Sequence, residues 1–520
     1  MTGTGRARAR LQTVPLAFLV VFFVWPVAHM LVRYVRWGDV VRVVTDPSLR
    51  GVAWFTLWQA VVSTVLTLVI GLPVTWAVSR WAVPGSRLVH GLVTAPFLMP
   101  AVVVATGVAA VIPGRGIPAI LWAHTVFNVA VVLHLVGPRW RMVGQSMEDA
   151  AADLGATGWR TFMSVVWPEI RGAVINAASV VFAFCFSSFA VVSILGGATI
   201  RTLETEVFTQ AVRLGDVRTA TSLAVVQTTA VVITLWLGRR SARNERSGDG
   251  DSDNHSLLEL SPPRSLASRR RFVALPAVTA WAGTLVVVTP LGAVALRSVR
   301  TAGGWGISGW RALFDGSLER VGVDVPRVLL TSAKFAVSTA VLATVLALLT
   351  TRRTGVSPAE RVSFAPLVVS AVTLGLGLIV TFDRAPWDWR GRSWLLPVIH
   401  TVIALPLAVR TIGTALRGID GELFHAAADL GASPLRVWWT IEMPLLRPAI
   451  VQAAGISAAV SLGEFGATSF LSRSGSMTVP IAIGQLMGRP GTLLQQAAFA
   501  LATLVAAVTT IVIGSAGRQD

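Results

Sequence analysis

The sequence has 520 residues, of which 53% are hydrophobic, and its mean hydropathy is +0.67. This apolar share excludes an ordinary soluble domain, because many runs reach the roughly 20 residues that span a bilayer. The net charge of +18 comes almost entirely from arginines in the loops between apolar runs. That distribution suits anionic lipid rather than nucleic acid, so we predict an integral membrane protein with no nucleic-acid partner.

In chain order, the apolar runs predict an all-α, polytopic protein of the cell membrane with twelve transmembrane helices. The first span follows three arginines and is longer than a signal-peptide core, so we expect it to remain uncleaved. Six spans are expected in the first half, near residues 12–34, 52–79, 88–112, 117–136, 172–196 and 219–238. Six more are expected in the second half, near residues 273–297, 328–350, 363–382, 394–414, 449–470 and 492–514.

The spans divide the chain into a first half, residues 1–238, and a second half, residues 273–520. Residues 239–272 between them are polar and charged and contain Pro262-Pro263, which predicts a linker. Arginines concentrate in the N-terminal tail and in this linker, whereas aspartates accompany the arginines of the outer loops. Because inner loops carry the positive charge, we expect both termini to be cytoplasmic.

One heptapeptide occurs twice without change, as Ala150-Ala-Ala-Asp-Leu-Gly-Ala156 and as Ala426-Ala-Ala-Asp-Leu-Gly-Ala432, an offset of 276 residues. At the same offset His124 matches His400, and Pro96 matches Pro366 at an offset of 270. We interpret the chain as an internal duplication of two homologous six-helix halves. Because each half has an even number of spans, the halves share one orientation, and a substrate route is expected between them.

Each copy of the heptapeptide predicts a short helix, a turn and a second helix on the cytoplasmic face. The landmarks are a glycine for the left-handed end of the first helix, a hydroxyl residue that caps the second, and a proline before which the second helix is expected to stop. These are Gly155, Thr157 and Pro168 in the first copy and Gly431, Ser433 and Pro444 in the second. Leu154 and Leu430 add apolar anchors beside the turns.

These segments resemble the EAA loop of permease subunits from binding-protein-dependent ABC importers, whose pattern EAAxxxG is followed by a proline thirteen residues later. The acidic position holds Asp149 in the first copy but His425 in the second. The resemblance implies the type I ABC importer permease fold, with coupling loops at about 147–168 and 423–444 that dock on the ATPase. The implied coupling residues are Asp149, Ala150, Ala151, Leu154, Gly155, His425, Ala426, Ala427, Leu430 and Gly431.

The partners that the resemblance implies are cytoplasmic ABC ATPase subunits in two copies, an extracytoplasmic substrate-binding protein and the lipid membrane. The phosphate-binding loop GxxxxGK needs a lysine after glycine, but Lys334, the only lysine, follows Ala333. The chain therefore lacks that ATP site. We predict a transport subunit that is not an enzyme and needs no cofactor or metal. The single cysteine, Cys185, excludes an internal disulfide.

Two stretches in the fifth and eleventh spans are candidates for the translocation path or gate: Ser187, Ser188 and Phe189, and Glu464 and Phe465. With the fusion of two halves, they resemble the iron(III) and thiamine group of fused permeases, so one of these solutes is the expected substrate. The stretch 463–468 also resembles molybdate and sulfate permeases, which leaves such anions as an alternative. From another class, the alternative is a twelve-span ion-coupled secondary transporter with Glu464 as its coupling group.

Overall fold

The computed structural model describes residues 12–246 and 274–516, except residues 113, 198, 302, 354, 390 and 474. Within this part of the chain, ten helices are long and apolar enough to cross a membrane, or up to twelve if each of two bent helix pairs counts as one span. The prediction of an all-α polytopic membrane protein is confirmed. Residues 239–246 of the expected linker continue a helix, and the rest of the linker lies outside the described residues.

The elements follow in chain order, where η marks a π-helical or 3-10 turn. The first half contains α2 (Thr13–Leu19), η1 (Val20–Val24), α3 (Trp25–Tyr34), α4 (Trp37–Thr45), α5 (Pro47–Arg80), α6 (Ser86–Leu98), α7 (Ala101–Val111), α8 (Ile117–Met142), α9 (Gln145–Asp153), α10 (Gly158–Thr161), η2 (Phe162–Val166), α11 (Trp167–Phe186), α12 (Ala190–Leu195), α13 (Leu203–Phe208), η3 (Thr209–Arg213) and α14 (Val217–Arg246).

The second half opens with a long helix and a two-stranded antiparallel hairpin in which Arg300 pairs with Trp305. Its elements are α15 (Ala274–Ser298), β1 (Arg300–Thr301), β2 (Gly304–Trp305), α16 (Ser308–Ala312), η6 (Ser317–Val321), α17 (Val325–Thr350), α18 (Pro358–Val362), η7 (Ala365–Val368), α19 (Ala371–Thr381), α20 (Leu395–Arg417), α21 (Gly421–Asp429), α22 (Pro434–Val437), η8 (Trp438–Glu442), α23 (Met443–Gly463), α24 (Gly466–Leu471), α25 (Val479–Met487) and α26 (Thr492–Ala516).

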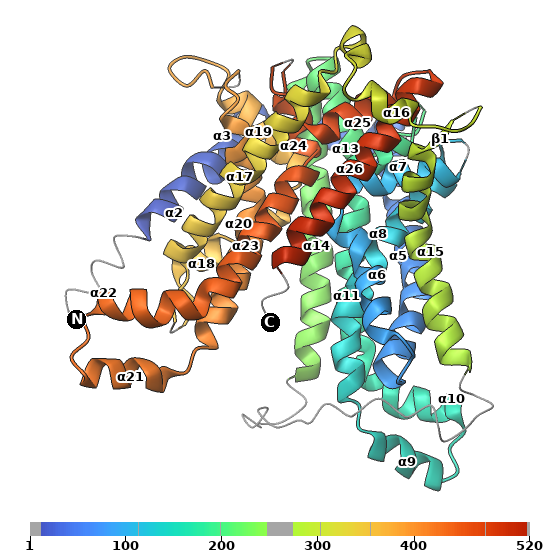
Figure 1. The fold of residues 1–520 in the computed structure, drawn as a ribbon, viewed down its shortest axis with the longest axis vertical. Helices are drawn as coiled ribbons and strands as arrows, with labels where there is room; N and C mark the ends of the chain where they lie inside the picture. The colour runs from blue at the N-terminus through green and yellow to red at the C-terminus, as the bar shows by residue number, and fades with distance from the viewer. Residues whose placement is uncertain are drawn as a thin grey trace. The chain divides into compact units, whose positions relative to one another are not determined.

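The chain forms two compact units that cut across the sequence halves. Unit 1 combines residues 1–43 and 204–225 with residues 297–520, and unit 2 combines residues 44–203 with residues 226–296. The first span of each half is therefore exchanged into the unit formed mainly by the other half. In unit 1, α2 and α3 lie beside α17 and α19 (Figure 1). In unit 2, Ala280 and Val287 of α15 belong to the same apolar core cluster as Val74 of α5.

Each exchanged span packs through a proline against a glycine. In unit 2, Pro290 of α15 lies against Gly107 of α7, where an added Cβ would come within 2.4 Å of the Pro290 carbonyl oxygen. In unit 1, Pro26 of α3 lies against Gly377 of α19, where the corresponding distance is 3.3 Å. Gly107 and Gly377 match at the repeat offset of 270. Glycine at this position allows the two backbones to approach each other, and both units use the same device.

The change of repeat offset from 270 to 276 falls in the connection between α19 and α20. From proline to histidine the second half counts 34 residues against 28 in the first, the landmarks being Pro366 and His400 and their equivalents Pro96 and His124. The longer connection is rich in tryptophan, and Trp389 stacks on Phe382 with 4.9 Å between ring centroids. The ring centroid of Phe22 in η1 lies 6.2 Å from that of Phe382. The insertion thus supplies an aromatic surface against which the first span packs.

The third and ninth spans, predicted as single runs near 88–112 and 363–382, are sharply bent instead. α6 and α7 meet at 105°, and the segments Pro358–Val368 and Ala371–Thr381 meet at 102°. The bends have local causes. Pro100 is the residue before α7, where a proline disfavours continuation of the preceding helix. Ser370 caps α19 by accepting a hydrogen bond from the Thr373 N–H, which starts a new helix.

Candidate functional site

Both copies of the heptapeptide fold as the predicted helix, turn and helix. At the end of α9, Gly155 has a φ of +78°. Its N–H donates to the Ala152 carbonyl at 2.9 Å, and the Ala156 N–H donates to the Ala151 carbonyl at 3.0 Å. These two bonds form a Schellman motif, which satisfies the last carbonyls of the helix and requires a left-handed residue. The glycine is therefore needed for its backbone conformation.

The second copy repeats this geometry at the end of α21. Gly431 has a φ of +73°. Its N–H donates to the Ala428 carbonyl at 2.9 Å, and the Ala432 N–H donates to the Ala427 carbonyl at 2.9 Å. The identical residues thus give the same turn in both halves. The predicted left-handed helix ends at the two glycines are confirmed.

The predicted caps of the second helix are also confirmed. The Thr157 hydroxyl accepts from the Arg160 N–H at 3.4 Å, and the Ser433 hydroxyl accepts from the Arg436 N–H at 3.4 Å. The predicted stop before the proline is wrong. α10 continues through η2 into α11 as one apolar helix, Gly158–Phe186, and the second copy does the same over Leu435–Gly463.

The π-helical turn explains how each helix passes its proline. At the end of η2 the Trp167 N–H donates to the Phe162 carbonyl, five residues back. Pro168 follows directly, in the first turn of α11, so the wide turn lies where the helix has to accommodate a residue without an N–H. The second copy uses the same device, with the Met443 N–H donating to the Trp438 carbonyl before Pro444. A wide turn absorbs the irregularity that we expected to end the helix.

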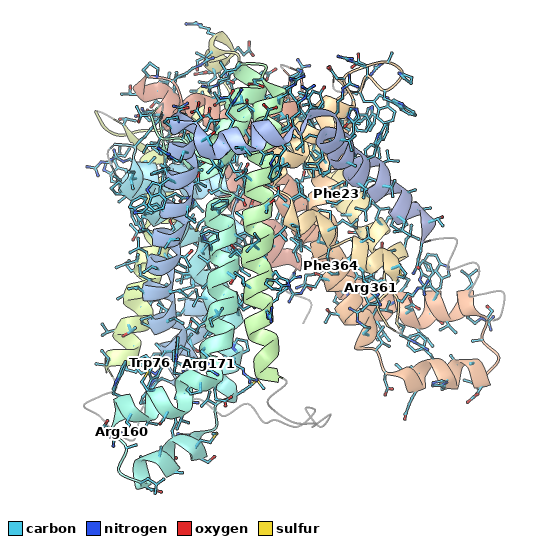
Figure 2. The ribbon with its side chains drawn as sticks, turned by 180° about the vertical axis from the view of Figure 1, so that it is seen from behind. Phe23, Trp76, Arg160, Arg171, Arg361 and Phe364 are labelled. Atoms are coloured by element: carbon cyan, nitrogen blue, oxygen red, sulfur yellow. The ribbon has the colours of Figure 1, made fainter. Side chains whose placement is uncertain are left out.

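The tips of the two turns are highly exposed. The side chains of Leu154 and Leu430 are 89% and 88% exposed. Asp149, Ala150, Gly155, His425, Ala426 and Gly431 are exposed as well, whereas Ala151 is half-buried and Ala427 is buried. In unit 2, α9 and α10 lie beyond the ends of α8 and α11 (Figure 1), and Figure 2 shows Arg160 at this end of the unit. An exposed leucine beside small residues is a surface that another protein can cover closely.

An arginine at or just beyond the end of the second span of each half contacts the first helix of the repeated segment. In the first half, Arg80 at the end of α5 donates to the Val143 carbonyl at 2.7 Å and forms an ion pair with Glu148 of α9. In the second half, the Arg353 guanidinium lies 3.9 Å from the ring centroid of Phe424 in α21. Phe424 matches Glu148 at the repeat offset of 276. The partner positions are equivalent, but Arg80 matches Thr350 at the offset of 270, so the second half uses a different arginine and a cation–π contact in place of an ion pair.

A second attachment joins the end of the fourth span to the first helix of the bent pair. In the first half, Arg141 contacts the His90 imidazole, with Nη2 and Nε2 3.3 Å apart. In the second half, Arg417 forms an ion pair with Glu360 at 2.9 Å. Arg417 matches Arg141 at the offset of 276, and Glu360 matches His90 at the offset of 270. Here the ion pair belongs to the second half.

The fifth and eleventh spans, predicted to run on to residues 196 and 470, are each broken at the candidate path residues. α11 ends at Phe186, and Ser187, Ser188 and Phe189 separate it from α12. α23 ends at Gly463, and Glu464 and Phe465 separate it from α24. Both serines are half-buried, while Phe189 and Glu464 are each 7% exposed. The Phe465 ring packs on α25, where an added Cβ at Gly484 would lie 3.0 Å from its Cε2.

Glu464 caps α24. Its carboxylate accepts from the Ala467 N–H at 2.9 Å, the Thr468 N–H at 2.8 Å and the Thr468 hydroxyl. His400 completes the network, because its Nε2 lies 2.9 Å from the Thr468 hydroxyl and its Nδ1 lies 2.8 Å from the Ser461 hydroxyl. Both carboxylate oxygens have donors, so the group that we singled out as a gate or coupling carboxylate holds the break in α23–α24 in place.

The equivalent histidine of the first half has a poorer network. His124 Nδ1 lies 3.1 Å from the Ser63 hydroxyl, whereas its buried Nε2 has no hydrogen-bond partner among the described residues. Ser188 occupies the position of Glu464, and Cys185 occupies that of Ser461. The Asn128 amide donates to Cys185 Sγ at 3.5 Å. The first half therefore keeps the histidine beside its broken span but lacks the carboxylate that caps the next helix in the second half.

Sequence reasoning identified both turns and Glu464 but missed the partners that fix them. Arg80 and Glu148 are 68 residues apart in the chain, and no local pattern joins them. The contact between Arg353 and Phe424 could not be read from the sequence either, because the two residues lie 71 positions apart. Within residues 12–246 and 274–516, no group of three or more His, Cys, Asp or Glu side chains forms a metal-binding arrangement.

Residues 340–519 match the family described as binding-protein-dependent transport system inner membrane component. The thiamine transport system permease protein of Brucella abortus is 25% identical over 85% of this chain and 83% of its own length. That of Salmonella typhimurium is 23% identical over 87% and 85%. The probable ABC transporter permease protein y4fN of Sinorhizobium fredii is 26% identical over 90% and 88%. The similarities to these three relatives extend over both halves of the chain, whereas the family match lies within the second half.

Proposed function

We propose, from the premise that this chain is a permease of the binding-protein-dependent ABC importer family, that it is the membrane subunit of an ATP-driven importer for thiamine. Two cytoplasmic ABC ATPase subunits supply the energy, and an extracytoplasmic binding protein delivers the solute. The single observation that carries this proposal is the pair of identical, exposed helix–turn–helix segments. A duplicated docking surface suits a pair of ATPase subunits.

The coupling residues in this proposal are those around the two turns. Leu154 and Leu430 enter apolar grooves of the ATPase subunits, and Gly155 and Gly431 keep the turns tight. Asp149 and His425 are exposed and face the ATPase. The first presents a carboxylate and the second an imidazole. With both termini cytoplasmic, as the arginine distribution indicates, both segments lie on the side where ATP is available.

The translocation gate in this proposal is formed at the breaks in the fifth and eleventh spans. Helix breaks inside a membrane are tolerated where neighbouring groups satisfy the freed backbone, and Glu464 does so for α24. Ser187, Ser188 and Phe189 form the first break, and Phe465 forms the second together with Glu464. Alternating access then changes the exposure of the two breaks from one side of the membrane to the other.

Thiamine is favoured because two of the relatives carry that solute in their names and match more than four fifths of the chain. Iron(III), the other solute of the group that the sequence resembles, is the second candidate. Molybdate and sulfate are supported by the stretch 463–468 alone. An ion-coupled carrier loses its main argument, because the carboxylate of Glu464 is engaged in capping a helix.

Reconstitution tests the proposal. The full chain is placed in liposomes with its ATPase subunit and its binding protein, and uptake of labelled thiamine, ferric ion and molybdate is measured. We expect thiamine uptake that requires ATP and the ATPase and that persists when ionophores collapse all ion gradients. Uptake that stops with the gradient and proceeds without ATP would overturn the importer, and ATP-driven uptake of ferric ion or molybdate alone would overturn the substrate.

A further inference from the structure

The connection between the fourth span and the first coupling helix is held by one buried guanidinium. Arg80 is 6% exposed, although it is the last residue of α5. One nitrogen, Nη1, donates to the carbonyl of Val143, the residue directly after α8. The other, Nη2, pairs with Glu148 in the first turn of α9. Arg80 therefore binds both ends of the link between α8 and α9.

The charges of this pair are placed where each helix favours them. A cation stabilises the C-terminal end of a helix, and an anion stabilises the N-terminal turn. Arg80 ends α5, and Glu148 lies in the first turn of α9. The side chain of Glu148 is only 13% exposed. A pair with so little water around it is strongly destabilised when one partner is removed.

The second half makes the corresponding attachment without an ion pair. Arg353 lies three residues beyond the end of α17, and its guanidinium stacks on Phe424 in α21. A cation–π contact allows the ring to slide under the cation, whereas the Arg80 guanidinium is fixed by acceptors in two directions. The first coupling helix is therefore tied to its second span more rigidly than the second one.

We propose that Arg80 is a positioning residue for energy coupling, which transmits displacement of α9 to α5 through its ion pair with Glu148. The inference rests on the proposed function, since it assumes that the ATPase moves α9. It adds that the two coupling helices transmit motion to the membrane helices with different rigidity. The first drives its second span through an ion pair, and the second acts through the softer contact between Arg353 and Phe424.

Uptake and ATP hydrolysis are measured together in liposomes that contain the full chain, the ATPase and the binding protein. For Arg80→Ala we expect ATPase association to persist and uptake per ATP hydrolysed to fall by about tenfold. The charge-swapped double variant Arg80→Glu with Glu148→Arg restores an ion pair but reverses both helix-end charges and removes the donor to the Val143 carbonyl, so we expect it to be better coupled than either single variant and to remain below wild type. For Phe424→Ala we expect a loss of less than about threefold.

The matched control is Arg139→Ala. Arg139 forms a more exposed ion pair with Glu169, at 3.6 Å, and its guanidinium also donates to the Glu169 carbonyl. We expect its uptake per ATP to equal that of wild type. If Arg80→Ala lowers the amount of folded protein, the swapped pair and Arg80→Lys provide the test at equal expression.

Three results separate the outcomes. A merely structural role of Arg80 would reduce ATP hydrolysis and uptake in equal proportion, and this would overturn the proposal. A swapped pair no better than the single variants would also overturn it. Wild-type uptake that needs no ATP would refute the importer itself, and this is seen without any variant.

Discussion

In the first half an ion pair joins Arg80 of α5 to Glu148 of α9, whereas in the second half the ion pair joins Glu360 of α18 to Arg417 of α20. The other attachment of each half has no carboxylate. In the second half the first helix of the repeated segment is contacted through Phe424, and in the first half the bent pair is contacted through His90. Each half thus has both attachments, but the ion pair with a carboxylate lies at a different one in each half. The two turns of identical sequence are therefore held by different kinds of contact.

The same divergence is seen at the broken spans. The second half closes its break with Glu464, where the first half has Ser188. A buried, hydrogen-bonded carboxylate costs much to desolvate, but its loss leaves several donors without an acceptor. The equal glycines of the two turns fix the same backbone geometry, whereas the residues that differ at the breaks, Glu464 and Ser188, change the hydrogen bonds that hold them.

The largest difference between the halves is expected at the breaks. Glu464→Ala removes the acceptor of two N–H groups and one hydroxyl, so we expect a destabilisation of about 3 kcal/mol. Ser188→Ala, its repeat counterpart, is expected to change stability by less than about 0.5 kcal/mol. The thermal unfolding midpoint of the purified full chain in detergent measures both. Equal shifts in the two variants would contradict the capping role of Glu464.

A smaller difference is expected at the bent pairs. Glu360→Ala breaks a pair whose carboxylate is buried but whose Arg417 side chain is 33% exposed. Because water can reach the freed guanidinium, we expect a loss of about 2 kcal/mol. His90→Ala removes hydrogen-bond partners of Arg141 and of the Ser86 carbonyl but breaks no ion pair with a carboxylate, and it is expected to cost about 1 kcal/mol. Thermal unfolding midpoints again measure both variants. A larger shift for His90→Ala than for Glu360→Ala would contradict the conclusion that the second half holds its bent pair more firmly.

At the turns the two halves are expected to behave alike. Gly155→Val and Gly431→Val meet no atom within 4 Å but must adopt a φ above +70°, which costs about 1–2 kcal/mol within an exposed turn. We expect normal amounts of protein in the membrane and uptake reduced by at least about tenfold in both. Uptake at the wild-type rate in both variants, at normal expression, would contradict their role in coupling.

The smallest effect is expected at the acidic position of the EAA pattern. His425 is exposed, so His425→Glu should change stability by less than about 0.5 kcal/mol. The change makes the second copy resemble the first, where Asp149 stands. Co-purification of the ATPase is expected to remain equal or to increase. If the ATPase is lost from this variant, His425 has been assigned to the wrong position of the pattern.

Local signals explain what the sequence predicted correctly. The apolar runs reported the spans, and the glycine and hydroxyl residues of the repeat reported both turns with their caps, because these depend on neighbours within a few residues. The bends at Pro100 and Ser370 and the continuation past Pro168 were missed. A proline shows that the helical hydrogen-bond pattern is interrupted at that residue. A bend, a helix end and a π-helical turn can each accommodate the interruption.

The exchanged first spans and the paired attachments were not predictable from one sequence. Pro290 approaches Gly107 across more than 180 residues of chain, and such pairing is decided by packing of the whole unit. The repeat itself held a usable signal, because Gly107 and Gly377 are equivalent glycines within apolar helices. A glycine that recurs at the repeat offset inside a helix indicates a close helix crossing.

Cross-linking tests most directly whether both turns dock the ATPase. Single cysteines replace Leu154 or Leu430 in a Cys185→Ala background, with Leu214→Cys as the control, since Leu214 is 66% exposed and lies outside both turns. A bifunctional maleimide is applied to the assembled complex. We predict that the cysteines at positions 154 and 430 both link to an ATPase subunit and that the control does not. Linkage of the control alone, or of none of the three, would contradict the account.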